Sequence, residues 1–431
     1  MARTDDRLLV IGAGPMGLAA AYYAAKAGWQ VEVLEAGDRP GGMAAHFDFN
    51  GLSLERFYHF CCRSDVDTTA LLAELGLPPI HWVPTKMGFF VDGELHRWGD
   101  PISLLTFPGM SLVEKVRYGL QAYLSTKRSD WRRLDKISAA DWFRAWCGPR
   151  VYDKLWRPLF ELKFYEHAES ISAAWVWQRI KRLGRSRRSL FQEELGYIEG
   201  GSEALVAALT AGIEKMGGKV HLSTPAARLL IEQGQVQGVE ARDGRRFEAS
   251  QVISTVAMPY VAAMLADQPE LARAYAQFEN IGVVCVVHQL AKPVTANFWV
   301  NISDPAIGAP GFVEFSNLRP LDRHIVYVPY YMPSDNPGFG RPDETFVDES
   351  YGYLQRVNPA LGPEDRIASH VARLRYAQPV CDVGFGDRIP DPQTPVAGLQ
   401  IADTCFYYPE DRGVSESIGY ARRLVESLPR A

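Results

Sequence analysis

A glycine motif near the start of the chain, residues 12–17 (Gly-Ala-Gly-Pro-Met-Gly), constrains the fold more than any other feature. A short apolar run, residues 7–11, precedes it, and an alanine-rich run typical of a helix follows over residues 18–28. A second apolar run, residues 30–34, delivers Glu35 eighteen positions after the last glycine. Because the motif lies between a strand and a helix, with an acid at this distance, it predicts a dinucleotide-binding βαβ unit.

Each part of the motif has a physical role in such a unit. Gly12 permits the tight turn, Gly14 lets the backbone approach a pyrophosphate, and Gly17 lets the helix pack close to the strand. The start of the helix offers unpaired N–H groups and a partial positive charge to the phosphates. Glu35 is expected to accept hydrogen bonds from the ribose hydroxyls of adenosine. An acid at this position disfavours a 2′-phosphate, so NADP is not expected.

The residues after Glu35 distinguish FAD from NAD. The stretch from Glu35 to Gly42 reads Glu-Ala-Gly-Asp-Arg-Pro-Gly-Gly. This ExxxRxGG pattern is similar to that of the FAD-binding members of the glutathione-reductase-like superfamily. The resemblance implies that FAD is the cofactor, that Arg39 lies near its phosphates, and that the residues after Gly42 run along the flavin.

Four later segments extend the resemblance over nearly the whole chain. Residues 196–205 resemble the Gly-Gly-then-helix segment of such proteins, and residues 217–226 resemble the strand whose backbone meets the adenine. Residues 251–256 resemble a strand of the same domain, and residues 398–418 resemble the last FAD motif, where a helix directs its N–H groups at the flavin. Together they resemble the flavoproteins that include amine oxidases, protoporphyrinogen oxidases and phytoene desaturases. UDP-galactopyranose mutase is a more distant relative.

The resemblance implies a set of FAD contacts spread over both ends of the chain. Many relatives carry Gly-Asp or Gly-Thr-Glu before the last helix, where this chain has Ala402-Asp403-Thr404, so Asp403 and Asp411 are both candidates for the ribityl contact. The full set of implied cofactor residues is Gly12, Gly14, Pro15, Met16, Gly17, Glu35, Ala36, Arg39, Gly41, Gly42, Met43, Ala226, Asp403, Asp411, Ser415, Ser417 and Ile418.

The fold class implied by the resemblance is α/β, a Rossmann-like FAD-binding domain of glutathione-reductase type interleaved with an α+β substrate domain. We expect residues 1–80, 195–280 and 375–431 to form the FAD-binding domain. Residues 81–194 and 281–374 then form the substrate-binding domain.

Hydrophobic spacing predicts several elements of the substrate domain. Residues 111–124 and 138–146 have helical spacing, and the continuous apolar run at 281–289 indicates a buried strand. Residues 323–331 also indicate a strand. Pro329 favours an edge position or a strand end there, because proline cannot donate a ladder hydrogen bond.

Candidate catalytic residues lie in residues 55–60, which relatives place close to the flavin ring. His59 is the candidate proton acceptor or hydrogen-bond partner, with Tyr58 and Arg56 as further contacts, and a structural histidine is the alternative. Amine oxidases of the family commonly carry a lysine on the strand that opens the second insertion, and residues 281–289 contain none. This departure argues against a plain amine oxidase.

Candidate substrate-contacting residues are the aromatic and amide side chains of the second insertion, with a purely structural core as the alternative. They are Trp299, Asn301, Asn317, Tyr327, Tyr330 and Tyr331. We also expect Tyr407 or Tyr408, which precede the last helix, to cover the flavin ring.

Composition and charge limit the partners and the cellular compartment that we expect. A net charge of −5 gives no reason to expect nucleic acid, and six scattered cysteines without a CxxC pair argue against zinc and fit a reducing cytoplasm. Because the first residues are acidic and polar, we expect no secretory signal peptide. Residues 127–188 hold sixteen Lys/Arg against seven Asp/Glu, with six tryptophans nearby. Such a region indicates either a peripheral membrane contact or basic helix faces over buried indoles.

These observations predict an FAD-dependent oxidoreductase that oxidises a partly apolar organic substrate by hydride transfer to flavin N5. The substrate is lipid, isoprenoid, porphyrinogen or sugar-linked, and no metal is expected. Because a single dinucleotide fingerprint is present, we expect the electrons to pass to O2 or a quinone. The alternatives are a nonredox sugar mutase resembling UDP-galactopyranose mutase and a catalytically silent flavoprotein.

Overall fold

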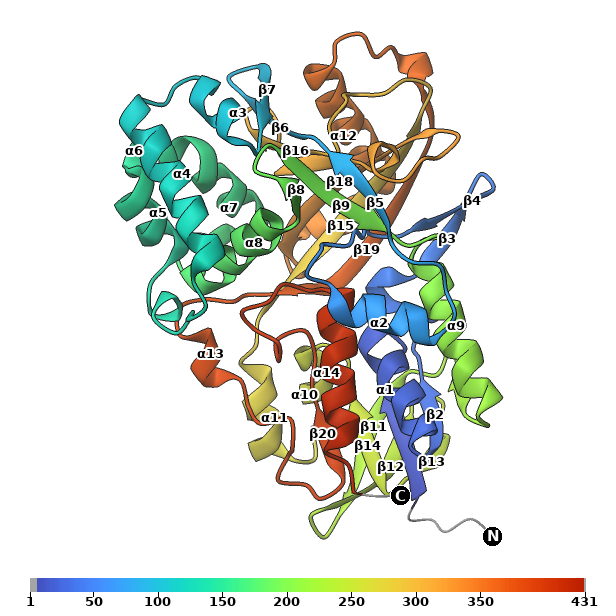
Figure 1. Cartoon of the computed structure of the whole chain (residues 1–431). Helices are drawn as coiled ribbons and strands as arrows, with labels where there is room; N and C mark the ends of the chain where they lie inside the picture. The colour runs from blue at the N-terminus through green and yellow to red at the C-terminus, as the bar shows by residue number, and fades with distance from the viewer. Residues whose placement is uncertain (1–5, 430–431) are drawn as a thin grey trace.

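The computed structural model describes residues 6–429. A five-stranded, all-parallel sheet of order β10–β2–β1–β14–β20 occupies the lower half of Figure 1. Its strands are β1 (Arg7–Ile11), β2 (Gln30–Leu34), β10 (Lys219–His221), β14 (Gln251–Ser254) and β20 (Leu399–Ile401). The chain runs outward from β1 in both directions, so the carboxyl ends of β1 and β14 flank the crevice in which such sheets bind ligands.

Helix α1 (Pro15–Lys26) joins β1 to β2 and packs against α9 (Ser202–Lys215) and α14 (Val414–Glu426). Its alanines 19–21 are fully buried, so the alanine-rich sequence lets these neighbours approach closely. A Cβ on Gly17 would lie 1.9 Å from the carbonyl oxygen of Gly12, a distance that no side chain tolerates. The glycine is therefore required by the packing of α1 on the first turn.

A seven-stranded mixed sheet of order β19–β15–β18–β17–β16–β6–β7 forms the upper half of the molecule. Strand β16 pairs in parallel with β6, so the two insertions share one sheet. One face packs on the main core, and the other packs beneath α12 (Asp343–Val357) as a second core. The strands are β6 (Met87–Val91), β7 (Glu94–Trp98), β15 (Asn280–Leu290), β16 (Trp299–Ser303), β17 (Gly311–Glu314), β18 (His324–Pro333) and β19 (Arg366–Pro379).

The expectation that Pro329 marks an edge or an end of its strand is wrong. Strand β18 lies inside the sheet, and Pro329 sits in its middle, opposite Cys285 of β15. The other neighbour, β17, pairs only with Val326 and Tyr327. Because β17 does not extend past Pro329, the missing N–H interrupts no ladder on that side.

A helical layer covers one side of the seven-stranded sheet, at the upper left of Figure 1. In this layer α4 packs on α3, α5 and α8, and α7 packs on β18. The predicted helices over 111–124 and 138–146 are confirmed as α4 and α5. The helices of this layer are α3 (Pro101–Thr106), α4 (Leu112–Lys127), α5 (Ala139–Cys147), α6 (Pro149–Val151), α7 (Arg157–Phe164) and α8 (Ala173–Arg185).

The remaining elements are short connections and small sheets. A hairpin, a three-stranded sheet β11–β12–β13 and a three-stranded sheet β5–β9–β8 flank the two large sheets. The remaining helices are α2 (Val66–Glu74), α10 (Met258–Met264), α11 (Pro269–Ala276) and α13 (Phe385–Arg388). The remaining strands are β3 (His46–Phe49), β4 (Leu52–Glu55), β5 (His81–Thr85), β8 (Arg187–Ser189), β9 (Gln192–Tyr197), β11 (Ala226–Glu232), β12 (Gln235–Ala241) and β13 (Arg246–Glu248).

The expected α/β class is confirmed, and the division of the chain into two interleaved domains stays a proposal. Strand β9 spans the proposed boundary at residue 195, which it crosses while pairing with β5 and β8. Among the described residues, no helix is long and apolar enough to cross a membrane.

Candidate active site

A cavity of about 840 Å³ opens at the carboxyl ends of β1 and β14. Three distant parts of the chain line it: the glycine motif with residues 34–44, the loop before β11, and the start of α14. Its size is that of a ligand-binding site. The expected motifs are therefore brought together around one enclosed space.

Helices α1 and α14 both begin at this cavity, and no described side chain caps either of them. Helix α1 follows Gly14 and helix α14 follows Gly413, and both glycines line the cavity. Their free N–H groups and helix dipoles favour a negatively charged ligand. A Cβ on Gly14 would meet none of the described atoms within 4 Å, so the cavity reaches its backbone.

Glu35 is held in place from two sides at the end of β2. Its Oε2 accepts a hydrogen bond of 2.8 Å from the Ala13 N–H, and its Oε1 accepts one of 2.7 Å from the Gly37 N–H. The carboxylate lines the cavity and is only partly buried. Each oxygen keeps a free lone pair, which suits it to accept hydrogen bonds from a pair of ribose hydroxyls.

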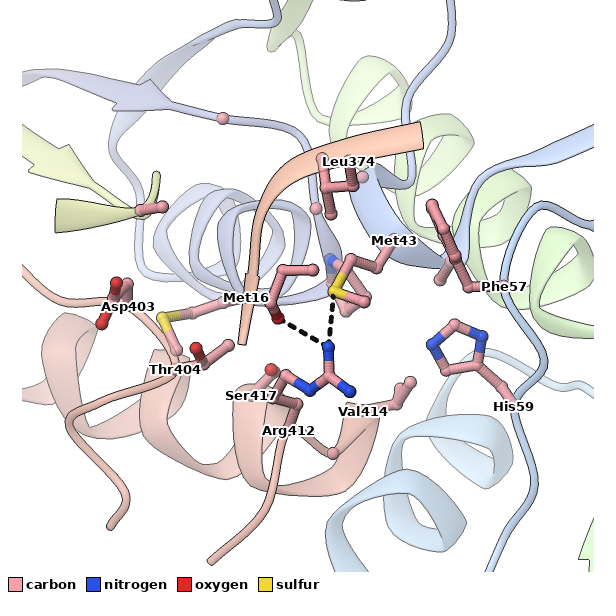
Figure 2. Close-up of a pocket in the computed structure, with 18 of the residues that line it drawn as sticks. Met16, Met43, Phe57, His59, Leu374, Asp403, Thr404, Arg412, Val414 and Ser417 are labelled. Atoms are coloured by element: carbon pink, nitrogen blue, oxygen red, sulfur yellow. Dashed lines mark hydrogen bonds between the residues drawn. The ribbon is translucent and has the colours of Figure 1, made fainter. Parts of the chain in front are cut away.

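Arg412 also lines the cavity, and Figure 2 shows it between Met43 and Val414, with His59 and Asp403 to either side. It donates a hydrogen bond of 2.6 Å to the Ala377 carbonyl and approaches Met43 Sδ at 3.9 Å. This partly buried guanidinium presents positive charge to the cavity. Sequence reasoning missed this residue, because arginine in a loop carries no pattern of its own.

His59 lines the same cavity, and among the described residues its Nδ1 has no hydrogen-bond partner. Burial lowers the pKa of His59, so the neutral imidazole predominates. The neighbouring Glu55 is ionised: burial opposes this, but a hydrogen bond and the charge of His46 bring its pKa to about 2. A buried ring nitrogen without a protein partner fits a hydrogen bond to a bound molecule.

A second cavity of about 1000 Å³ adjoins the first. Aromatic and aliphatic side chains of β16, β18, α3, α4, α7 and α8 form most of its wall. Eight residues line both cavities, so the two spaces meet. They are Tyr58, Phe60, Arg179, Arg182, Trp299, Pro329, Tyr331 and Asp411.

Charged groups gather where the two cavities meet. Arg179 forms an ion pair with Asp411, and Arg182 pairs with Asp65 at 2.8 Å. Burial opposes ionisation of Asp411, but Arg179, followed by Arg412 and Lys163, holds its pKa well below the usual range. These arginines are therefore neutralised by carboxylates.

Lys163 differs from these arginines. It projects from α7 among three aromatic rings, with Nζ 4.8 Å from the centroid of Tyr331, 5.0 Å from Trp175 and 5.5 Å from Phe164. Within residues 6–429, no hydrogen bond or ion pair engages this amine. Burial, reinforced by Arg179, lowers its pKa well below the usual range. Lys163 lines the second cavity, and sequence reasoning did not find it.

A family model of flavin-containing amine oxidoreductases matches residues 17–402. The chain belongs to this family. A phytoene desaturase (neurosporene-forming) of Cereibacter sphaeroides is 28% identical over 287 residues, which cover 58% of this chain and 52% of the relative. The chain spans about half the length of the first two desaturases that it matches.

Solved structures show the same fold across nearly the whole chain. A protein of Exiguobacterium sp. 255-15, provisionally assigned as a protoporphyrinogen oxidase, aligns with a TM-score of 0.75 and 20% identity over 98% of both chains. Reduced UDP-galactopyranose mutase aligns with a TM-score of 0.76 and 15% identity, over 98% of this chain and 93% of the mutase. Both likenesses concern the fold alone.

The family and the shape of the first cavity agree on the cofactor. Two uncapped helix starts, the exposed backbone of Gly14, the oriented Glu35 and the unpartnered nitrogen of His59 fit the pyrophosphate, ribose and ring of one extended molecule. The predicted flavin cofactor, FAD, is confirmed.

The predicted cofactor residues divide into those that line the first cavity and those that do not. Gly12, Gly14, Pro15, Met16, Glu35, Ala36, Gly42, Met43, Ala226, Asp403, Asp411 and Ser417 line it. Gly17 and Gly41 shape the backbone behind it, Ile418 is fully buried in the core, and Ser415 accepts a hydrogen bond from the Thr68 N–H. Arg39 is exposed and outside the lining, so its predicted phosphate contact gains no support.

Among the predicted catalytic residues, His59 and Tyr58 line the first cavity and Arg56 does not. The Arg56 guanidinium faces outward, 3.8 Å from Asp38. Tyr58 packs edge-on against Trp299, with ring centroids 5.3 Å apart. Tyr407 lines the cavity, whereas the hydroxyl of Tyr408 donates to Asp135 at 2.5 Å.

The predicted substrate residues also divide. Trp299, Asn301 and Tyr331 line the second cavity, where the Trp299 indole donates to Asn301 Oδ1 at 3.0 Å. Asn317 instead bonds two backbone carbonyls, and the buried Tyr327 donates to the Glu55 carbonyl at 2.8 Å. Tyr330 points to the other face of β18, into the second core, because neighbouring strand residues face opposite ways.

For the basic region 127–188, the choice between a peripheral membrane contact and basic helix faces over buried indoles stays a prediction. Trp142, Trp175 and Trp177 are buried, with Arg179 and Lys181 over the indoles of Trp175 and Trp177 at 4.6 and 4.5 Å. All six cysteines are buried and free. These three tryptophans therefore offer little surface to a membrane, whereas Trp131, Trp146 and Trp156 are only partly buried.

Proposed function

We propose that this chain is an FAD-dependent oxidoreductase that oxidises a large, partly apolar substrate held in the second cavity. The observation that carries the proposal is the junction of the two cavities at Tyr58, Trp299 and Tyr331. A molecule in the second cavity reaches the end of the first where His59 and Arg412 lie. Bound there, the flavin accepts a hydride from a C–H bond and serves as the electron sink.

The walls of the second cavity support an apolar substrate. Aromatic and aliphatic side chains dominate them, and the arginines at the junction are already paired with Asp411 and Asp65. Excluding water from such a space protects the transferred hydride. Isoprenoid or other lipid-like molecules of this size match both the cavity and the desaturase relatives.

Lys163 lines the second cavity beside Tyr331 of the junction, and no ion pair within the described residues engages its amine. Burial lowers the pKa of the amine well below its usual range and so favours the neutral form, which can accept the proton that the substrate loses on oxidation. The rings of Tyr331 and Trp175 hold the amine at the cavity wall. We assign Lys163 as the proton acceptor and His59 as a hydrogen-bond partner of the flavin.

A nonredox sugar mutase is the second candidate, supported by the fold of UDP-galactopyranose mutase. A nucleotide sugar carries a pyrophosphate, which requires unpaired cations. Three arginines of the second cavity, Arg179, Arg182 and Arg187, each lie beside a carboxylate, and the mostly apolar wall around them favours the oxidoreductase. Electrons then leave to O2 or a quinone, as the single dinucleotide fingerprint suggests.

The deciding experiment is anaerobic mixing of the holoenzyme with pools of candidate substrates while the flavin absorbance is followed. Isoprenoid and lipid pools are expected to bleach the flavin, and sugar nucleotides are not. Conversion of a nucleotide sugar by chemically reduced enzyme, without bleaching by any pool, would replace the oxidoreductase with the mutase.

A further inference from the structure

Helix α4 has its polar and apolar sides reversed relative to an ordinary surface helix. Its fully buried side chains are Gln121 and Ser125, whereas its large apolar side chains point outward. The exposed fractions of the four largest contributors are 68% for Leu112, 67% for Val113, 58% for Val116 and 55% for Tyr123. An apolar face this exposed on a folded protein marks a binding surface.

The apolar face continues beyond α4. We define the docking face as the exposed apolar side chains of α3, α4 and the turn between β8 and β9. They are Ile102, Leu105, Leu112, Val113, Val116, Leu120, Tyr123, Leu124, Leu190 and Phe191. On α4 these residues extend over about 18 Å, at the helical rise of 1.5 Å per residue.

Basic residues border the docking face. Lys127 and Arg128 end α4, and Arg185 and Arg188 lie beside it at the end of α8 and in β8. Of the nearby acids, Glu114 is already paired with Arg150. An apolar helix face with a basic border is the pattern of a helix that lies in the interface of a bilayer containing anionic lipid.

A second copy of the chain fits this face less well. In a two-fold dimer the same surface meets itself, so the basic border of one copy would oppose the basic border of the other. An anionic membrane complements both the apolar centre and the charged border. Charge complementarity therefore selects the membrane over self-association.

The docking face surrounds the opening of the second cavity. Leu105, Lys115, Val116, Tyr123 and Leu190 belong both to this region of the surface and to the lining of that cavity. A membrane covering the face would bring acyl chains to the cavity mouth. An apolar molecule could then pass from the bilayer to the junction at Tyr331 without crossing water.

We propose that the docking face binds the surface of an anionic lipid bilayer, with α4 lying in the membrane plane. This goes beyond the proposed function, since it concerns where the protein works and not its chemistry. It also differs from the contact predicted for residues 127–188, because the apolar anchor is α4 and not the buried tryptophans.

The test is flotation of the holoenzyme with vesicles of phosphatidylcholine, alone or with phosphatidylglycerol, at two salt concentrations. Wild-type protein is expected to float with the anionic vesicles and to be partly released by salt. Val113→Asp is expected to weaken binding roughly tenfold or more, because a charge would enter the apolar boundary. Lys127→Gln and Arg128→Gln are each expected to weaken binding to anionic vesicles roughly fivefold.

Val66→Asp is the matched control. Val66 is 66% exposed in the first turn of α2, and Val113 is 67% exposed in the first turn of α4, so both positions accept an aspartate without loss of folding. Equal loss of binding in both variants, or no flotation of wild type with either vesicle, overturns the proposal. A concentration-dependent dimer that Val113→Asp dissociates, without flotation, assigns the face to a second copy. None of these measurements uses turnover, so failure here leaves the proposed chemistry untouched.

Discussion

The two cavities meet at Tyr331, yet they are built by different means. The first has one part framed by backbone, namely the glycines, the starts of α1 and α14 and the loop that Glu35 holds, while side chains such as Phe57 and Tyr260 line the rest. The second is formed by side chains that reach in from α3, α4, α7, α8, β16 and β18. A cofactor common to a family needs a fixed cradle, whereas a substrate site can change through its side chains while the sheet behind it stays the same.

The largest effects are expected from substitutions of Gly17 and Gly14, two glycines of the motif that forms part of the first cavity. Gly17→Ala puts a methyl 1.9 Å from the Gly12 carbonyl oxygen, so we expect little folded protein and no retained flavin. Gly14→Ala meets no described atom and has an ordinary φ of −70°, so the fold should survive while FAD binding weakens roughly tenfold or more. Circular dichroism and FAD titration distinguish the two. Normal FAD affinity in Gly14→Ala would show that the pyrophosphate lies elsewhere.

A change in the second cavity should spare the cofactor. Lys163→Met removes the amine and keeps most of the bulk, so flavin reduction by substrate should slow by roughly 10²- to 10⁴-fold with FAD affinity unchanged. In wild type, the rate of flavin reduction should rise with pH as the amine becomes neutral. The Lys163→Met variant should lose this rise. Lys181→Met is the control, because Lys181 also lies over an indole but lines neither cavity. A wild-type rate and pH profile in Lys163→Met would exclude the proton acceptor.

Substitution of Glu35, whose side chain lines the first cavity, should weaken FAD binding by less than Lys163→Met slows flavin reduction. Glu35→Ala removes the expected ribose contact, and hydrogen bonds to charged groups contribute about 1.5–3 kcal/mol, so FAD should bind roughly 10- to 100-fold more weakly. Glu32→Ala on the same strand, where Glu32 faces His221, should leave FAD affinity unchanged. Equal affinities for the two variants would mean that the ribose contact has been misplaced.

The smallest effect on binding or rate is expected at Glu314, in the sheet behind the second cavity, where the change appears in the pH dependence of stability. Burial raises the pKa of Glu314 to about 7, above that of an unfolded glutamate, despite hydrogen bonds from Val294 and Thr295. The folded state therefore holds the extra proton, and its stability falls as pH rises from about 4.5 to 7, by at most about 1.4 kcal/mol per pH unit. Thermal melts with saturating FAD should show a shallower decline in Glu314→Gln than in wild type. An identical decline contradicts the raised pKa.

The sequence predicted the first cavity well because its constraints are local. Glycine spacing, strand length and an acid at a set distance specify a turn, and the turn specifies where a phosphate binds. Arg39 is the exception: its motif position is right, but its side chain points outward. A pattern fixes the backbone path and leaves the direction of a long side chain undetermined.

The second cavity resisted prediction because its residues meet only in three dimensions. Lys163 lies 168 positions from Tyr331, and nothing in the sequence joins them. Tyr330 and Tyr331 look equivalent in the sequence, yet they face opposite sides of β18. The apolar outer side of α4 was likewise hidden, because a helical period shows that one face is apolar without showing which way it points.

The strand order of the parallel sheet also governs when the protein can acquire its cofactor. Strand β1 pairs with β14, more than 240 residues later, and β14 pairs with β20 near residue 400. A ribosome completes both insertions before it makes β20, Arg412 and the start of α14. The early glycine motif therefore lacks the rest of its cavity until the last part of the chain is made, so FAD binding is a late event of synthesis. During that interval the nascent N-terminal half has unpaired sheet edges, and exposed edges of this kind are prone to aggregation.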